Sequence, residues 1–219
     1  MYKIKTLIFF ILLASLHAMG QQTITLPNGW SLSPAGSSLP LGDLPLNIAV
    51  SKSKKLIAVT NNGQGKQSIQ LINTKTKKIL DNIEVAKSWL GLCFGGNDQY
   101  LFASGGNDNL VLQYAIIKNK LVLKDSIILG KKWPTKISPA GIDIDDKKKL
   151  LYVVTKDNNS LYIINLLNKE IIQKLKLDGE AYTCLLSNSK NELYISCWGC
   201  DKLIVFNTQT KNIIAQIAV

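Results

Sequence analysis

Short apolar runs separated by polar turns follow one another along the chain from about residue 44 to its end. The runs are about 4 to 8 residues long, rich in β-branched and aromatic residues and bounded by Gly, Asn and Asp, which is typical of β-strands. Beyond residue 20 the sequence shows no long 3.6-residue periodicity bounded by helix caps. The pattern therefore predicts an all-β protein.

Four copies of one strand pattern recur at nearly constant spacing. The second run of each copy begins in steps of 45, 50 and 42 residues, at Leu56, Leu101, Leu151 and Leu193. The third runs keep the same phase, near Ser68, Leu110, Ser160 and Lys202. Four strands in a repeat of about 42 residues are the signature of a β-propeller blade.

We therefore predict a partial β-propeller of four blades, each with four antiparallel strands, over residues 44–87, 88–133, 134–178 and 179–219. One such sheet cannot bury both of its faces alone, so each blade must pack on its neighbours. We expect an open arc or a small strained ring whose exposed edges favour aggregation.

The first 20 residues have the three zones of a secretory signal peptide. Lys3 and Lys5 precede the apolar run Leu7–Leu13, and small residues end at Gly20. The apolar stretch is shorter than the roughly 20 residues that a membrane-spanning helix needs. We therefore expect export to the periplasm or the cell exterior, no transmembrane span, and a lead-in over residues 21–43 whose run Thr23–Leu26 can form a strand.

Charge and composition limit the partners and the chemistry that we expect of this chain. The net charge is +11, yet all positive side chains are lysines, because the sequence contains no arginine. Lysines cluster in turns and cannot form the bidentate fork that recognises phosphates and guanine edges, so nucleic acid is not an expected partner. The single histidine, His17, lies in the signal peptide. We expect no catalytic residues, no cofactor and no metal in the mature chain.

Aromatic and amide residues gather in the loops that open on one face of a propeller, namely the loop before strand one and the loop joining strands two and three. Aromatic platforms beside amides and carboxylates can bind a sugar, a peptide or another protein domain. The same Asn and Asp residues are also what tight turns require. The candidate binding face comprises Asn61, Asn62, Trp89, Asn107, Asp108, Trp133, Asp157, Asn158, Tyr182, Trp198 and Asp201.

Two further groups of residues, a cysteine motif and an acidic cluster, allow more than one interpretation. Cys197 and Cys200 form a C-x-x-C motif, which fits incidental thiols, a disulfide or a redox pair; its place where a strand meets a loop disfavours the redox role. The carboxylates of Asp143, Asp145 and Asp146 could hold calcium. The lysines that follow them at 147–149 favour a solvated turn instead.

Several motifs resemble a known family. The runs Ala58–Asn61 and Tyr152–Thr155 are similar to the signature of the YVTN-repeat (YncE-like) β-propellers. The segments Leu26–Trp30, Ser33–Gly36, Ser88–Leu92 and Ser138–Gly141 resemble the propeller at the start of exported bacterial proteins in which an alkaline-phosphatase-type phosphoesterase domain follows. Such propellers commonly have seven blades, so this chain resembles a truncated member.

The candidate binding face and the resemblance together lead us to expect one of two functions. The first is an exported non-catalytic binding or scaffold module for a protein, a peptide or a glycan. The second is the propeller fragment of a bifunctional phosphoesterase whose catalytic domain is missing from this chain. In both cases the chain itself is not expected to be an enzyme, because the catalytic domain of the resembled family is absent from it. Propeller motifs by themselves specify a fold better than a function.

Overall fold

A computed structural model describes residues 23–33, 36–187 and 189–219 of the chain. The expected signal peptide at residues 1–20 lies outside these ranges. The chain divides into two compact units at Pro40 and Leu41. In the first unit a small hairpin joins strands β1 (Ile24–Thr25) and β2 (Ser31–Leu32), and β1 falls within the expected run Thr23–Leu26.

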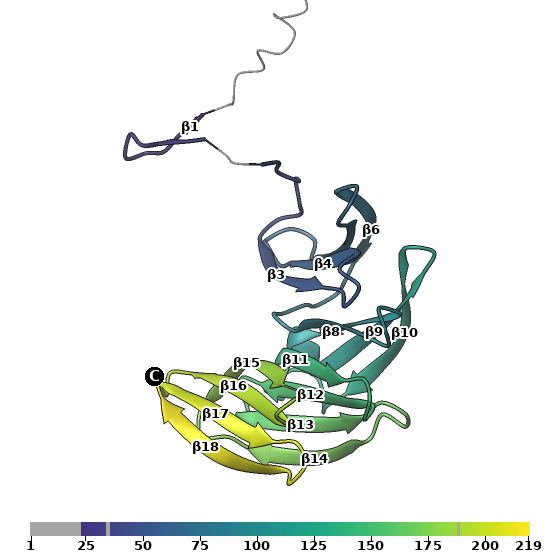
Figure 1. Cartoon of the computed structure of the whole chain (residues 1–219), viewed down its shortest axis with the longest axis vertical. Coiled ribbons are helices and arrows are strands. Elements are labelled where there is room, and N and C mark those ends of the chain that lie inside the picture. The colour runs from purple at the N-terminus through teal and green to yellow at the C-terminus, as the bar shows by residue number, and fades with distance from the viewer. Residues whose placement is uncertain (1–22, 34–35, 188) are drawn as a thin grey trace, which may run out of the picture. The chain divides into compact units, whose positions relative to one another are not determined.

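The second unit consists of four antiparallel sheets of four strands each (Figure 1). Within each sheet the strands pair in chain order, so each sheet is a meander. Blade 1 contains β3 (Pro45–Val50), β4 (Leu56–Asn61), β5 (Ser68–Asn73) and β6 (Lys78–Glu84). Blade 2 contains β7 (Leu92–Gly95), β8 (Tyr100–Ser104), β9 (Leu110–Ile117) and β10 (Lys120–Ile128). Blade 3 contains β11 (Pro139–Asp145), β12 (Leu150–Thr155), β13 (Ser160–Asn165) and β14 (Ile171–Lys176). Blade 4 contains β15 (Glu180–Ser187), β16 (Glu192–Trp198), β17 (Lys202–Asn207) and β18 (Asn212–Ala218).

The predicted all-β propeller with four blades of four strands is confirmed. Each sheet falls within one of the expected residue ranges. Leu41–Asp43, expected in the lead-in, belong to the second unit, where the Gly42 amide donates to Gln70 Oε1 at 3.2 Å. A single 3₁₀ turn (Gly106–Asp108) is the helical element of the described chain.

The hydrophobic core lies between consecutive blades. We call the side of a blade that packs on the preceding blade its leading face, and the side that packs on the following blade its trailing face. At the junction of blades 3 and 4, Tyr152 and Val154 on a trailing face pack against Leu193 and Ile195 on a leading face. Comparable clusters fill the other two junctions.

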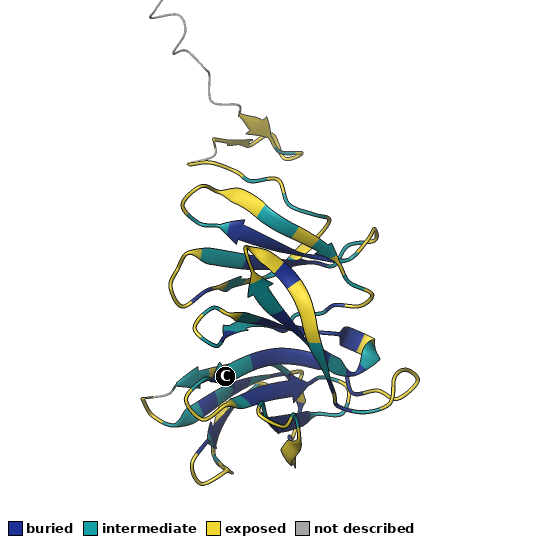
Figure 2. Ribbon diagram, turned by 90° about the vertical axis from the view of Figure 1, so that its right-hand side faces the viewer, coloured by how far each residue is buried: buried dark blue, intermediate teal, exposed yellow. Residues whose placement is uncertain are grey.

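The middle strands of blade 3 show why the pattern is apolar without alternation. In β12 and β13 nearly every side chain is buried, whichever face it occupies (Figure 2). Blade 3 has a neighbour on each side, so both of its faces are removed from water. A strand buried on both faces is expected to be a continuous apolar run.

The first strands of the four blades meet along one axis. A cavity of about 290 Å³ is lined by residues of β3, β7, β11 and β15. The strands approach closely because glycine occupies the tightest positions: a Cβ on Gly141 would lie 2.6 Å from the Cα of Thr183. This arrangement brings the loops of successive blades together at one end of the axis.

Candidate functional site

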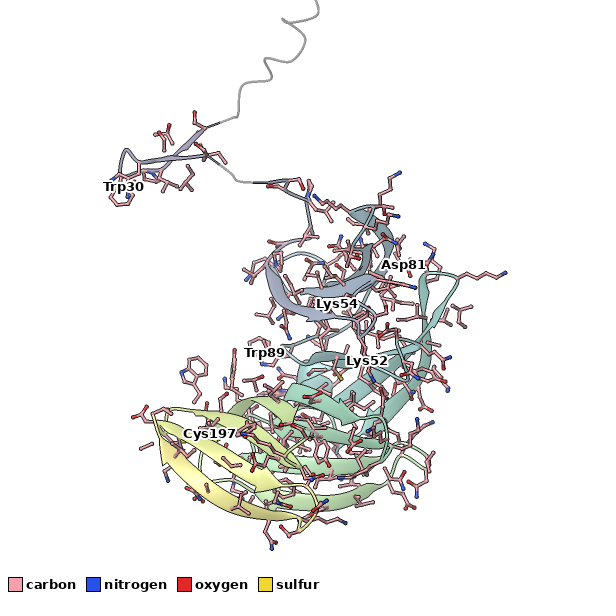
Figure 3. All side chains as sticks on the ribbon, viewed as in Figure 1. Trp30, Lys52, Lys54, Asp81, Trp89 and Cys197 are labelled. Carbon is pink, nitrogen blue, oxygen red and sulfur yellow. The ribbon has the colours of Figure 1, made fainter. Side chains whose placement is uncertain are left out.

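A pocket opens where the loops of blades 1, 2 and 3 meet. Its volume is about 340 Å³, within the range of small-ligand sites. We call it the loop pocket; it is lined by Asn62, Gln67, Lys87, Ser88, Trp89, Gly106, Asn107, Ser138, Lys156 and Asp157. Trp89 projects from the loop that precedes β7 (Figure 3). The pocket thus combines one aromatic ring with amides, hydroxyls and charges of both signs.

Ser88 joins blades 1 and 2 at the wall of the pocket. Its hydroxyl donates to Asn62 Oδ1 at 3.0 Å, and its backbone amide donates to Gln67 Oε1 at 2.8 Å. Both partners come from the loop between β4 and β5. These bonds fix the segment that carries Trp89 at the wall of the pocket.

Ser138 repeats this arrangement between blades 2 and 3. Its hydroxyl lies 2.6 Å from Asp157 Oδ2 and 3.3 Å from Asn107 Oδ1. Asn109 holds the backbone of the same segment, because its Oδ1 accepts from the amide of Ser138 at 3.0 Å and its Nδ2 donates to the carbonyl of Thr135 at 2.6 Å. Successive blades therefore place equivalent serines along the pocket.

The structure brings some of the candidate residues together and separates others. Asn62, Trp89, Asn107 and Asp157 line the loop pocket. Asp108 lies beside it and forms an ion pair with Lys132 at 3.4 Å. The others do not line the loop pocket: Asn61, Trp133, Asn158, Tyr182, Trp198 and Asp201.

Three of these other residues have structural partners. Asn61 is fully buried and donates to Ser68 Oγ and Gln70 Oε1, each at 3.1 Å. Asn158 donates to the hydroxyl of Tyr162 at 2.8 Å and contacts Thr155. Asp201 has a left-handed φ of 48° in the turn between β16 and β17, and its carbonyl accepts from the amide of Val219 at 3.0 Å. They hold loops in place, as tight-turn residues do.

Three aromatic residues remain beside the pocket. The rings of Tyr182 and Trp198 pack edge to face with centroids 5.2 Å apart. The ammonium of Lys156, a pocket residue, lies 5.7 Å from the Trp198 ring. Trp133 is 60% exposed, and its amide donates to the carbonyl of Asn107 at 3.3 Å. The exposed aromatic surface thus continues from the loop pocket toward blade 4.

The surroundings of Cys197 disfavour a reactive thiolate. Cys197 and Cys200 are free thiols. Burial, followed by the proximity of Cys200, raises the pKa of Cys197 to about 12. A thiol must ionise to act as a nucleophile, so this environment disfavours a redox role.

The acidic cluster differs from its expected setting. The prediction of a solvated turn is wrong for Asp145, which is buried and accepts from the amides of Lys147 and Lys148 at 3.0 Å each. Asp146 accepts from the amide of Gly96 in blade 2 at 2.6 Å. These carboxylates cap turns and join blades. Within the described residues no group of three His, Cys, Asp or Glu side chains could hold a metal ion.

Sequence reasoning missed the hydroxyls and the charged side chains of the loop pocket. Ser88 and Ser138 stand at the same place in consecutive repeats, three residues before Gly91 and Gly141. An alignment of the repeats by these glycines would have identified both serines. Gln67, Lys87 and Lys156 carry no comparable signal, because such residues are common in exposed turns.

Comparison with known proteins supports the fold. No model of a known protein family matches the sequence, and no curated protein matches it. A solved structure of hydrazine synthase from Kuenenia stuttgartiensis is similar, with a TM-score of 0.62 and 15% sequence identity over 84% of this chain and 52% of that chain. This chain therefore spans about half the length of that one. At this identity the likeness shows the β-propeller fold alone, and the resemblance to YVTN-repeat propellers stays a prediction.

Across the parts of the chain that the structure describes, no helix is long and apolar enough to cross a membrane.

Proposed function

We propose that this chain is an exported, non-catalytic binding module that takes a small polar ligand, a sugar or a short peptide, in the loop pocket. The observation that carries the proposal is the convergence of three blades on one cavity containing Trp89. An aromatic face excludes water from one side of a ligand, and amides and carboxylates give it a defined orientation.

The polar groups of the pocket are suited to holding a ligand. Ser88 and Ser138 are engaged by the protein itself, so the neighbouring groups are fixed in position. Lys87 and Lys156 add positive charge to a pocket that also contains the carboxylate of Asp157, which suits a ligand with both donors and acceptors. Preorganised groups lose little entropy on binding.

The test is a titration of the full chain with a panel of neutral and acidic oligosaccharides and short peptides, followed by calorimetry. We expect one class to bind, and Trp89→Ala to weaken that binding by about tenfold, or roughly 1.4 kcal/mol. Trp30→Ala is the matched control, because Trp30 is 72% exposed in the other unit. If no probe binds, or if the two variants bind equally well, the proposal fails.

The second candidate follows from the likeness to exported propeller–phosphoesterase proteins. In that case the loop pocket would guide a substrate to a catalytic domain encoded beyond Val219. Reading the coding sequence past that residue tests this directly. Further repeats followed by a metal-binding phosphatase domain would support it, whereas a stop codon there would contradict it.

A further inference from the structure

The two cysteines of the C-x-x-C motif lie at the turn between β16 and β17, at the junction of blades 3 and 4. Cys197 lies near the end of β16 (Figure 3) and pairs with Lys202 at the start of β17. Cys200 is the third of the four residues between this pair. Cys197 is buried in the apolar cluster that joins the two blades, and Cys200 packs against the same cluster. The two side chains therefore lie on the same side of the turn.

The equivalent turn of blade 3 shows that side chains at these two positions meet. Thr155 pairs with Ser160 as Cys197 pairs with Lys202, so Thr155 stands in the place of Cys197. Asn158 stands in the place of Cys200, three residues further on. The hydroxyl of Thr155 donates to the side-chain oxygen of Asn158. In blade 3 a side-chain hydrogen bond thus crosses the turn between the two positions.

The equivalent turn of blade 2 shows how close the two backbone positions are. Gly105, whose amide donates to the carbonyl of Leu110, stands in the place of Cys197, and Asp108 stands in the place of Cys200. The amide of Asp108 donates to the carbonyl of Gly105 at 3.1 Å. Such a bond closes a β-turn, whose first and fourth Cα atoms are less than about 7 Å apart. A disulfide needs Cα atoms roughly 4.4 to 6.8 Å apart, so a turn of this kind suits one.

Gly179, in the link between blades 3 and 4, leaves room for both cysteine side chains. A Cβ at this position would lie 2.3 Å from Sγ of Cys200 and 3.3 Å from Cβ of Cys197. The two side chains therefore share one small space beside the glycine. After burial, the proximity of Cys200 also raises the pKa of Cys197, as expected for thiols that lie close together.

We propose that Cys197 and Cys200 form a disulfide that closes this turn and fixes the segment carrying Trp198. The bond takes the place of the side-chain hydrogen bond in blade 3, because thiols are only weak donors and acceptors. Trp198 packs on Tyr182 and lies near the ammonium of Lys156, a residue of the loop pocket. The disulfide therefore steadies the aromatic surface beside the loop pocket, whatever ligand that pocket takes.

The oxidant for this step is a small-molecule disulfide. Cys200 lines a cavity of about 430 Å³, so its thiolate can attack one sulfur of the oxidant and release one small thiol. Cys197 then attacks the sulfur of Cys200 in the mixed disulfide and releases the second small thiol. Two electrons and two protons thus pass from the protein to the oxidant. A thiol with a raised pKa is a poor leaving group, so the finished disulfide should be reduced slowly, as a structural disulfide is.

Peptide mapping tests the proposal on the full chain. The chain is incubated with excess oxidised glutathione or with a reductant, unfolded in urea, alkylated and digested with trypsin. Cleavage after lysine places Cys197 and Cys200 together in residues 191–202, and Cys93 and Cys184 in two other peptides. We expect residues 191–202 of the oxidised chain to be unalkylated and lighter by two hydrogens than the unmodified peptide. Cys93 and Cys184, which lie within β7 and β15, should be alkylated and serve as the internal control.

Thermal unfolding gives a second readout. Reduction of the oxidised wild type should lower its Tm by about 2 to 5 °C, because the cross-link no longer restricts the unfolded chain. Cys200→Ser cannot form the bond, so the reductant should leave its Tm unchanged. Cys93→Ser is the matched control: it keeps both cysteines of the motif and should show the same shift as the wild type.

Several results would overturn the proposal. In the mapping experiment these are alkylation of both cysteines in residues 191–202, glutathione that remains attached to Cys200, or a disulfide that links two chains or involves Cys93 or Cys184. In thermal unfolding, they are an unchanged Tm of the wild type on reduction, or equal shifts for the wild type and Cys200→Ser.

Discussion

Asn109 shows how one buried side chain can organise a functional loop. It is fully buried, has a left-handed φ of 56°, and its amide group bonds four backbone groups of residues 131–138. An amide satisfies both donors and acceptors there, and asparagine tolerates the left-handed backbone better than most residues. Asn109 therefore positions Ser138 in the loop pocket although it does not line the pocket itself.

Replacing Asn109 with leucine should destabilise the protein by about 2 to 4 kcal/mol, because buried backbone groups lose their partners. Urea unfolding measures the effect. Asn119→Leu is the matched control: Asn119 also has a left-handed φ, of 64°, but it is exposed and its side chain makes no hydrogen bond to any residue that the structure describes. Equal losses for the two variants would show that backbone strain, and not the hydrogen bonds, dominates.

Asp143 should make stability depend on pH. Burial raises its pKa above the usual value of 3.8, and the amides of Leu186 and Ile144 offset part of that rise. Above the raised pKa the buried charge opposes folding; as the pH falls toward 3.8, the folded state takes up the proton before the unfolded state does, so this penalty disappears. Relative to Asp143→Asn, which keeps only one of the two acceptor oxygens and does not titrate, the wild type should therefore gain stability as the pH falls from 7 toward 4. A difference that stays constant in urea unfolding across this range would contradict the assignment.

For individual residues, the sequence predicted which positions lie in the loops near the pocket better than it predicted what each side chain does there. It identified Asn62, Trp89, Asn107 and Asp157, which line one pocket. It also selected Asn61, which is buried and donates hydrogen bonds to Gln70 and Ser68. Adjacent residues at the end of a strand point to opposite sides, so a one-residue difference decides whether an amide faces a loop or the core. The composition of a loop does not contain that information.

At the scale of strands, the close approach of β11 and β15 depends on Gly141. A Cβ there would meet the backbone of Thr183 at 2.6 Å and the amide of Cys184 at 2.7 Å, and backbone atoms cannot rotate away. Gly141→Ala should therefore destabilise the protein by about 1 to 3 kcal/mol through overpacking. Gly65→Ala is the control, because its nearest neighbour would be Asp43 Oδ2 at 4.0 Å. Thermal and urea unfolding of both variants measure the difference; equal stabilities would show that the strands can separate without loss.

Strands were the most predictable part of the chain. Their runs, spacing and turn residues all agree, as expected when local preference and global fold are consistent. The sequence could not show which side chains meet across blades, because a period of two assigns residues to a face without naming the neighbour. The contact of Gly141 with Thr183, 42 residues away, is of this kind.

For the whole molecule, stability is expected to be a sum over blades and the junctions between them. The second strand of every blade is paired on both edges, so the four second strands differ mainly in how many junctions cover them. Blades 2 and 3 have two junctions, and blades 1 and 4 have one. Amide exchange reports such differences strand by strand.

In dilute solution we therefore expect β8 and β12 to exchange more slowly than β4 and β16, measured by hydrogen exchange with mass spectrometry. Equal protection of the four second strands would contradict the additive account of the blades and their junctions.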